Sequence, residues 1–139
     1  MGRVRETSLL GKKEILKFGT HSIQISITVD DIGVQANSEG RKIVQAGTIL
    51  GGNGGSILED DTIKAIKKNT QSERNIENGE ITKRENGLDA EGVLLDDVDV
   101  TYGPTDGTMV IHGFINLNKI PEAPCKDSEQ ALKNITFMV

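Results

Sequence analysis

Residues 90–116, AEGVLLDDVDVTYGPTDGTMVIHGFIN, decide the fold that the sequence predicts. Two apolar, β-rich runs flank a loop of Gly, Pro and Asp at residues 102–107. Such runs, separated by turn-forming residues, are typical of two strands that pair across a loop. No other part of the chain stays apolar for so long, so we expect the core to lie here.

Other stretches also predict strands. Residues 22–29, SIQISITV, alternate so that four β-branched side chains share one face, which is typical of a strand. Residues 41–50 predict a strand pair or a bent strand that breaks at Gly47. The terminal ITFMV, residues 135–139, is β-prone and is expected to join a sheet edge. The predicted fold is therefore mainly β.

The middle of the chain is polar and predicts surface structure. Residues 59–87 are expected to form a surface excursion outside the core, in which Asp61 begins a single helical turn. Asn78-Gly79 is a tight-turn signal and predicts a small hairpin. Towards the end, Asp127 or Ser128 is expected to cap one short helix.

Composition limits the class of protein. The chain has 139 residues, which fits one domain, and a net charge of -5, which disfavours nucleic acid as a partner. Aromatic residues make up 3%, so a stacking platform for bases or sugars is not expected. A single cysteine, Cys125, is interpreted as an inert thiol of a reducing cytosol. No apolar run approaches the roughly 20 residues of a membrane helix.

An acidic cluster is the first candidate site. Asp96, Asp97 and Asp99, with Asp106 near by, could offer carboxylate oxygens to calcium. Their spacing does not match an EF-hand loop. Asp97 and Asp99 would share one face of a strand and Asp96 the other. A solvated strand face is the favoured interpretation, because sheet edges are commonly charged.

The remaining candidates are weaker. His112 in an apolar strand and His21 near a strand start are interpreted as structural, since zinc needs three or four ligands. The loop GGNGG, residues 51–55, could cradle a phosphate, but no GK(S/T) follows it. A tight turn is the favoured interpretation, because glycine supplies positive φ. We therefore expect no catalytic residues, no metal and no cofactor.

Three stretches together carry a family resemblance. They are KIVQAGTILG at 42–51, AEGVLLDDVDVTYG with TMVIHGF at 90–114, and the closing segment at 131–137. In this order they resemble the lambda-type head decoration proteins of tailed bacteriophages, which stabilise the capsid. The resemblance covers roughly residues 42–139. A polar surface insertion is expected at about 72–89.

The resemblance implies a fold, a function and partners. It implies a small β-barrel, or β-tulip, with one short C-terminal helix, spanning residues 19–139 behind a flexible N-terminal arm at 1–18. It implies a non-enzymatic protein of the virion, made in the host cytoplasm. Such a protein binds the major capsid protein on the outer surface of the expanded head, often as a homotrimer at three-fold positions, and no nucleic acid or membrane.

The arm is the segment expected to dock on the capsid. Its candidate binding residues are Arg3, Arg5, Lys12, Lys13, Glu14, Ile15, Leu16, Lys17 and Phe18. The basic members would face an acidic capsid surface, and an extended arm can add a strand to a sheet edge.

Two other functions stay open. One is a carbohydrate-binding or host-surface-binding module displayed by a phage, which would need an exposed aromatic platform. The other is a small enzyme with a metal held by Asp96, Asp97 and Asp99.

Overall fold

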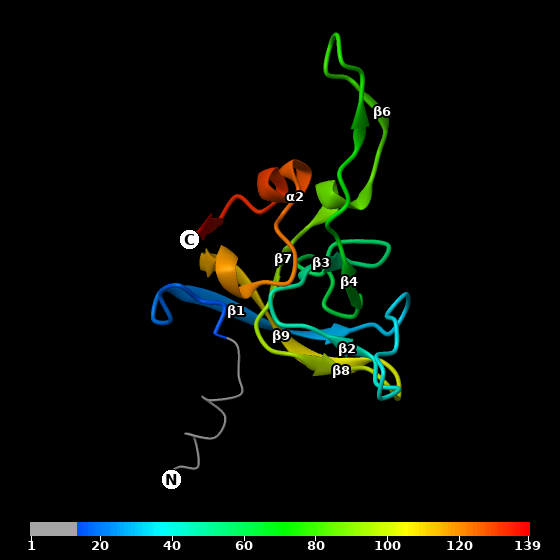
Figure 1. The fold of residues 1–139 in the computed structure, drawn as a ribbon, viewed down its shortest axis with the longest axis vertical. Helices are drawn as coiled ribbons and strands as arrows, with labels where there is room; N and C mark the ends of the chain where they lie inside the picture. The colour runs from blue at the N-terminus through cyan, green and yellow to red at the C-terminus, as the bar shows by residue number, and fades with distance from the viewer. Residues whose placement is uncertain (1–13) are drawn as a thin grey trace.

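The longest strand, β9 (Thr105–Asn116), is the centre of the fold. It pairs along its length with β1 (Ser22–Val29), antiparallel, from Ser22–Gly113 to Val29–Thr105. It also pairs with β7 (Gly92–Leu94), antiparallel, and with β10 (Ile135–Met138), parallel. The computed structural model describes residues 14–139, and Figure 1 shows β1 and β9 crossing the body of the molecule together.

The remaining pairings return to β1. β3 (Ile49–Gly52) pairs with β7 on one edge and with β4 (Ala65–Lys67) on the other, and β4 meets β1 through Val29 and Ala65. The pairings therefore run β1–β4–β3–β7–β9 and back to β1. Two small sheets are separate: β2 (Ile43–Val44) with β8 (Val98–Asp99), and β5 (Glu73–Arg74) with β6 (Ile81–Lys83).

Helical structure is brief. Two 3-10 turns, η1 (Asn86–Asp89) and η2 (Leu117–Lys119), precede the single described α-helix, α2 (Lys126–Ala131). The short helix near the C-terminus is thus confirmed, and the chain is mainly β as predicted. The cap is Cys125, whose sulfur accepts from the Ser128 N–H, so the predicted Asp127 or Ser128 cap was wrong. The tail joins the sheet edge as β10, as expected.

The stretch at 90–116 does hold core residues. Val93, Leu94, Met109 and Val110 are fully buried, which confirms the expected core. The predicted strand pair was only partly right. β7 pairs with β9, but residues 98–99 leave the hairpin and pair with β2. Backbone partners from another part of the chain decided that placement, and local alternation carries no information about them.

The strand predicted at 22–29 is β1, with one irregularity. A register shift between Ile23 and Gln24 interrupts the ladder with β9. Ile27 and Val29 beyond the shift are buried, whereas Ile23 is 55% exposed. The apolar face predicted from alternation is therefore buried only towards the end of β1, and the extra residue at the shift, Ile111, lies in β9.

Residues 59–87 are not wholly a surface excursion. β4 lies inside the main sheet, and Ala65 is fully buried. The helical turn predicted after Asp61 was also wrong, because residues 65–67 form this strand. Pairing with β1 and β3 overrides a weak local helix preference. The predicted hairpin around Gly79 is confirmed as β5–β6, which projects from the body at the top of Figure 1.

The core has two parts that share the central sheet. One part gathers around the ends of β9 and β10, and its buried members are Ile15, Leu16, Ala46, Ile49, Ala90, Val93, Val110, Ile115, Leu132 and Ile135. The other lies under β1, β3 and β4, and its buried members are Ile27, Val29, Val44, Leu50, Ile57, Ala65, Leu94, Val98, Val100 and Met109. The chain from Ile15 onward therefore belongs to the folded domain.

Candidate functional site

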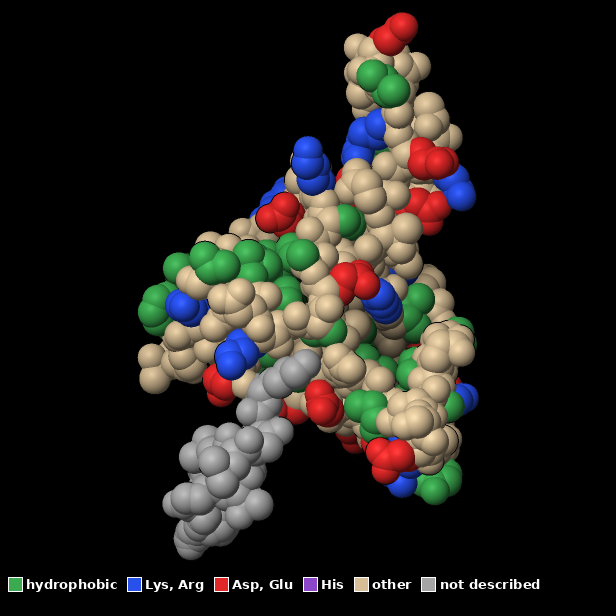
Figure 2. All heavy atoms as spheres, viewed as in Figure 1, with side chains coloured by type: hydrophobic (Ala, Val, Ile, Leu, Met, Phe, Trp, Pro, Cys, Tyr) green, Lys and Arg blue, Asp and Glu red, His purple; other side chains and the backbone are tan. Residues whose placement is uncertain are grey.

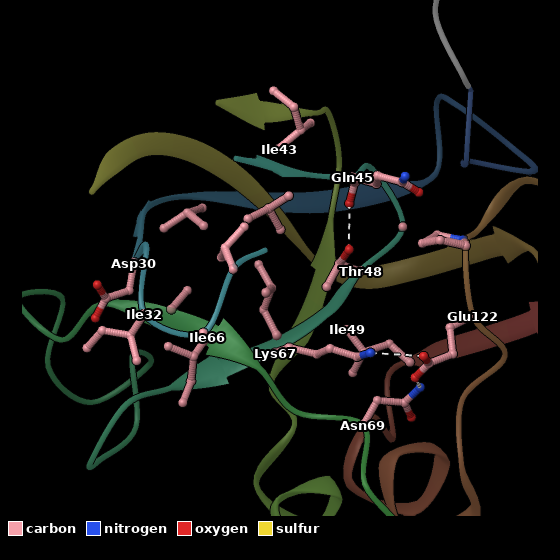
Figure 3. Close-up of a pocket in the computed structure, with 18 residues that line it drawn as sticks. Asp30, Ile32, Ile43, Gln45, Thr48, Ile49, Ile66, Lys67, Asn69 and Glu122 are labelled. Carbon is pink, nitrogen blue, oxygen red and sulfur yellow. Dashed lines mark hydrogen bonds and ion pairs between the residues drawn. The ribbon is translucent and has the colours of Figure 1, made fainter. Parts of the chain in front are cut away.

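A hollow opens between the end of β1, the turn from β2 to β3, and β4 (Figure 3). Its volume is about 280 Å³. Val29, Val44, Leu50 and Ala65 line it with apolar surface and are themselves buried. Such a concave apolar site with a few polar groups at its edge is the usual form of a binding pocket.

One edge of this hollow is a small polar network. The Lys67 ammonium lies 2.9 Å from Glu122 Oε2, and Asn69 Nδ2 donates to Glu122 Oε1 at 2.6 Å. Figure 3 shows these three side chains meeting on one side. The hydrogen bond from Lys67 lowers the pKa of Glu122. At the other edge the Asp30 carboxylate, 7% exposed, accepts from the Asp31 N–H at 2.8 Å. The hollow is therefore apolar at its centre and polar at two of its edges.

The glycine-rich loop at 51–55 already holds an anion, the carboxylate of Glu91. Oε2 accepts from the N–H groups of Gly52 at 2.8 Å and Ile57 at 3.0 Å. Oε1 accepts from Ser56 Oγ at 2.6 Å and from the Leu58 N–H at 3.2 Å. Burial raises the pKa of Glu91, but these hydrogen bonds outweigh it and the pKa is lowered.

The turn interpretation of GGNGG is supported by this geometry. Gly54 has φ +87°, which favours glycine. Two N–H groups of the loop already have acceptors: that of Gly52 donates to Glu91 and that of Asn53 donates to the Lys64 carbonyl. Sequence reasoning missed Glu91, since it lies far along the chain and no spacing rule connects it to the loop.

The acidic cluster does not assemble. Asp97 Oδ1 accepts from the Ala46 N–H at 2.7 Å, and Asp106 accepts from Thr28 Oγ1 at 3.3 Å. Asp99 accepts from Thr101 and forms an ion pair with Arg41. The Thr101 hydroxyl and the Arg41 guanidinium lower the pKa of Asp99 to about 2. Within residues 14–139 no group of three or more His, Cys, Asp or Glu could hold a metal ion.

Both histidines lie together with two of the three phenylalanines. The ring centroids of His21 and His112 are 5.7 Å apart, and those of His21 and Phe114 are 5.3 Å apart. Phe18 meets Phe114 edge-on at 5.4 Å and is 49% exposed. We call Phe18, His21, His112 and Phe114 the ring cluster. Sequence reasoning assigned its members separately and did not foresee that the β1–β9 register would bring them together.

Two of the predicted docking residues are buried within the described domain. Ile15 is fully buried and Leu16 is 9% exposed, because both pack into the core beside β9. The chain is held there by backbone bonds, with the Asn116 N–H donating to the Ile15 carbonyl at 2.7 Å. Glu14, Lys17 and Phe18 are exposed. The other predicted members, Arg3, Arg5, Lys12 and Lys13, lie outside the described residues.

A buried carboxylate fixes the base of the β5–β6 hairpin. Asp127, at the start of α2, is fully buried. It accepts from the Ser72 N–H at 2.8 Å and from Gln71 Nε2 at 3.2 Å, and it lies 2.8 Å from Arg74 Nη2. Burial raises the pKa of Asp127, but the bonds from Ser72 and Arg74 outweigh it and the pKa is lowered. The projecting hairpin is thus attached through charge and hydrogen bonds.

Comparison of the chain with known protein families, with functionally described proteins and with solved structures finds no match. Among the helices of residues 14–139, none has the length and apolar character needed to cross a bilayer. The function proposed below therefore rests on the residues themselves.

Proposed function

We propose that this chain is a non-enzymatic decoration protein of a tailed-bacteriophage head. It binds the major capsid protein on the outer surface of the expanded head and stabilises the head against the pressure of packaged DNA. It would be made in the host cytoplasm and carried on the virion. The observation that carries the proposal is the meeting in space of the stretches that resemble the lambda-type family.

Those stretches are far apart in sequence and adjacent in the structure. Residues 42–51 supply β2 and most of β3, and residues 90–114 supply β7, β8 and most of β9. β3 pairs with β7, β2 pairs with β8, and β10 from the closing segment pairs with β9. Residues outside the resemblance form the projecting β5–β6 hairpin. This arrangement supports one inherited unit with an insertion.

The finer fold assignment is part of the same proposal. A set of pairings that runs from β1 through β4, β3, β7 and β9 and back to β1 supports a small β-barrel of the tulip type. Assembly as a homotrimer at capsid three-fold positions completes the proposal. Phe18 and His21 of the ring cluster are exposed, as is the projecting hairpin at the top of Figure 2, and such contacts could use these surfaces.

Preferential binding explains the stabilisation. A protein that binds the expanded shell and not the unexpanded one shifts the balance towards the expanded state by mass action. Many weak contacts on one lattice add through multivalency. The net charge of -5 suits a surface that faces outward and does not meet DNA. The docking segment is now residues 1–13 with exposed Lys17 and Phe18, since Ile15 and Leu16 are core.

A sedimentation experiment tests this function. The full chain should sediment with expanded heads of the phage that encodes it, and not with unexpanded heads. A chain that begins at Glu14 keeps the core residue Ile15 and should stay folded by circular dichroism, yet lose most of its binding. If the full chain does not bind expanded heads, the function is wrong. If the shortened chain binds equally well, only the docking segment is wrong.

A further inference from the structure

A second concave site lies beside the glycine-rich loop, between that loop, the turn η1 and the end of α2. Its volume is about 710 Å³, within the range of roughly 300–1,000 Å³ that small-molecule sites occupy. Two lysines, Lys68 and Lys133, line it together with Gly54 and Gly55. We call this site the lysine recess. It shares no lining residue with the hollow of Figure 3.

The backbone of Lys68 is held from two sides. Its N–H donates to the Ile49 carbonyl at 2.8 Å, and its carbonyl accepts from Ser128 Oγ at 2.9 Å. The stem of its side chain crosses Gly51, where an added Cβ would lie 2.8 Å from Lys68 Cγ. Glycine at position 51 therefore leaves room for the stem, and these contacts fix the point from which the ammonium extends.

The ammonium of Lys68 is a charge without a partner in the described structure. The residue is 8% exposed, yet within residues 14–139 its ammonium forms no ion pair and no hydrogen bond. Lysine is seldom so buried unless it is paired. An ammonium taken out of water loses hydration that only an acceptor or an anion can replace. Because Lys68 lines the lysine recess, we expect the acceptor to bind there.

The carboxylates that line the lysine recess already have partners. Glu91 accepts four hydrogen bonds from residues 52–58, and Asp89 Oδ1 lies 2.6 Å from Arg84 Nη2. Lys133 is exposed and, in the described part of the chain, has no ion-pair partner. The local charges are thus three cations against two carboxylates, although the whole chain carries -5. This local excess favours an anion beside the two unpaired lysines.

The two lysines favour phosphate over a carboxylate. Lysine binds phosphate as a point charge. A phosphate monoester carries about −1.5 to −2 charges at neutral pH, so it gains more from two ammonium groups than a carboxylate does. Leu88, Ala90 and Ala131 add apolar surface to the lining. The volume of the lysine recess leaves room for an organic group attached to the phosphate.

We propose that the lysine recess binds a small phosphate-bearing molecule. The phosphate lies between the ammonium groups of Lys68 and Lys133, and the organic part lies against Leu88 and Ala131. The glycine-rich loop forms one wall, and the donors that hold Glu91 stay with Glu91. The site therefore differs from a phosphate-binding loop, in which backbone N–H groups hold the anion. It goes beyond the decoration function, which requires no small molecule.

Titration of the full chain, followed by amide NMR signals, tests the site. The probes are inorganic phosphate, glycerol 3-phosphate and acetate, at equal ionic strength and about pH 7.5. The signals of Gly54, Gly55 and Ala131 should shift with both phosphates, and acetate should bind at least about fivefold more weakly. The signal of Ile76 on the projecting hairpin should stay unchanged. Acetate that binds as tightly as phosphate, or phosphate that shifts none of these signals, overturns the proposal.

Two variants of equal net charge decide whether Lys68 holds the phosphate. Lys68→Met removes the ammonium and keeps an unbranched stem, and it should weaken phosphate binding by about tenfold or more. Lys119→Met removes an exposed charge from η2 and should bind phosphate as the parent does. Equal weakening in the two variants would mean attraction by overall charge alone. That result, or undiminished binding by Lys68→Met, overturns the proposal.

Thermal unfolding gives a readout that a merely structural lysine would change in the opposite direction. Without phosphate, Lys68→Met should be at least as stable as the parent, because it removes a buried charge that has no partner. Phosphate should raise the Tm of the parent and leave that of Lys68→Met unchanged. A strong loss of stability in Lys68→Met would assign the ammonium a structural role and overturn the proposal. Sedimentation with expanded heads is measured separately, so this outcome leaves the decoration function intact.

Discussion

The central sheet and the β5–β6 hairpin are stabilised in opposite ways. β7 is buried at every residue, from Gly92 to Leu94. β6 is exposed at every residue, from Ile81 to Lys83. The sheet is held by apolar contact across two core clusters. The hairpin projects into solvent, and its base is joined to α2 through the carboxylate of Asp127.

The comparison shows how a projecting hairpin can be attached without a core of its own. An apolar core needs contacts from many strands, and its stability is shared among them. A polar base needs only one well-bonded carboxylate, provided that all its partners are present. Damage to the sheet should therefore be global, and damage at the hairpin base should be local.

The largest expected effect is the loss of a core side chain. Leu94→Ala removes a fully buried side chain from β7 and should lower the free energy of unfolding by about 2–5 kcal/mol. Urea denaturation measures it. Leu58→Ala is the matched control, since Leu58 is 57% exposed and its truncation should change stability by about 0.5 kcal/mol or less. Similar losses for the two variants would contradict the division into core and surface.

A smaller and more local effect is expected at the hairpin base. Asp127→Asn leaves Arg74 and the Ser72 N–H short of a charged acceptor and should cost about 1–3 kcal/mol. Hydrogen exchange of residues 72–83 should speed up more than that of β9. Glu129→Gln, at an exposed position of the same helix, should leave the free energy of unfolding and the exchange rates of residues 72–83 unchanged.

The Asp127 effect should depend on pH. The folded state lowers the pKa of this carboxyl below its ordinary value of 3.8, so its contribution is complete above that pH. It is lost as pH falls through the lowered pKa. The stability difference between the parent and Asp127→Asn should therefore shrink below about pH 4. A difference that grows on acidification would show that Asp127 is not the ionised partner of Arg74.

The smallest effect is expected at the hairpin tip. Ile76 is fully exposed, so Ile76→Ser should change the free energy of unfolding by about 0.5 kcal/mol or less. Thermal unfolding at several protein concentrations measures it. A larger, concentration-dependent change would mean that the tip is buried against another copy, which would give the hairpin a role in self-association.

Much of the sheet could be predicted from residue patterns. The alternation at 22–29 and the apolar runs around 93–114 predict strands because apolar side chains on one face of a strand are buried when the strand joins a sheet. β4 and β8 could not be found this way. Their residues are short and mixed in character, and they become strands because Val29, Gly52 and Val44 offer backbone partners. Such pairing depends on the whole chain.

The surfaces were harder to predict than the core. Glu14–Phe18 was expected to form part of one docking arm, yet Ile15 and Leu16 face inward while Lys17 and Phe18 are exposed. The ring cluster forms because the β1–β9 register brings together residues that lie far apart in the sequence. The hollow likewise combines residues from four segments of the chain, so no local sequence motif predicts it.

The carboxylate in the glycine-rich loop has a consequence for selectivity. Glu91 is covalently tethered to the four donors that it satisfies, so it acts as a ligand at high effective concentration. A free phosphate or carboxylate in solution would have to displace this internal competitor. The glycines serve other close contacts, because a side chain at Gly51 would meet the Asp89 carbonyl and one at Gly55 would meet Ile63.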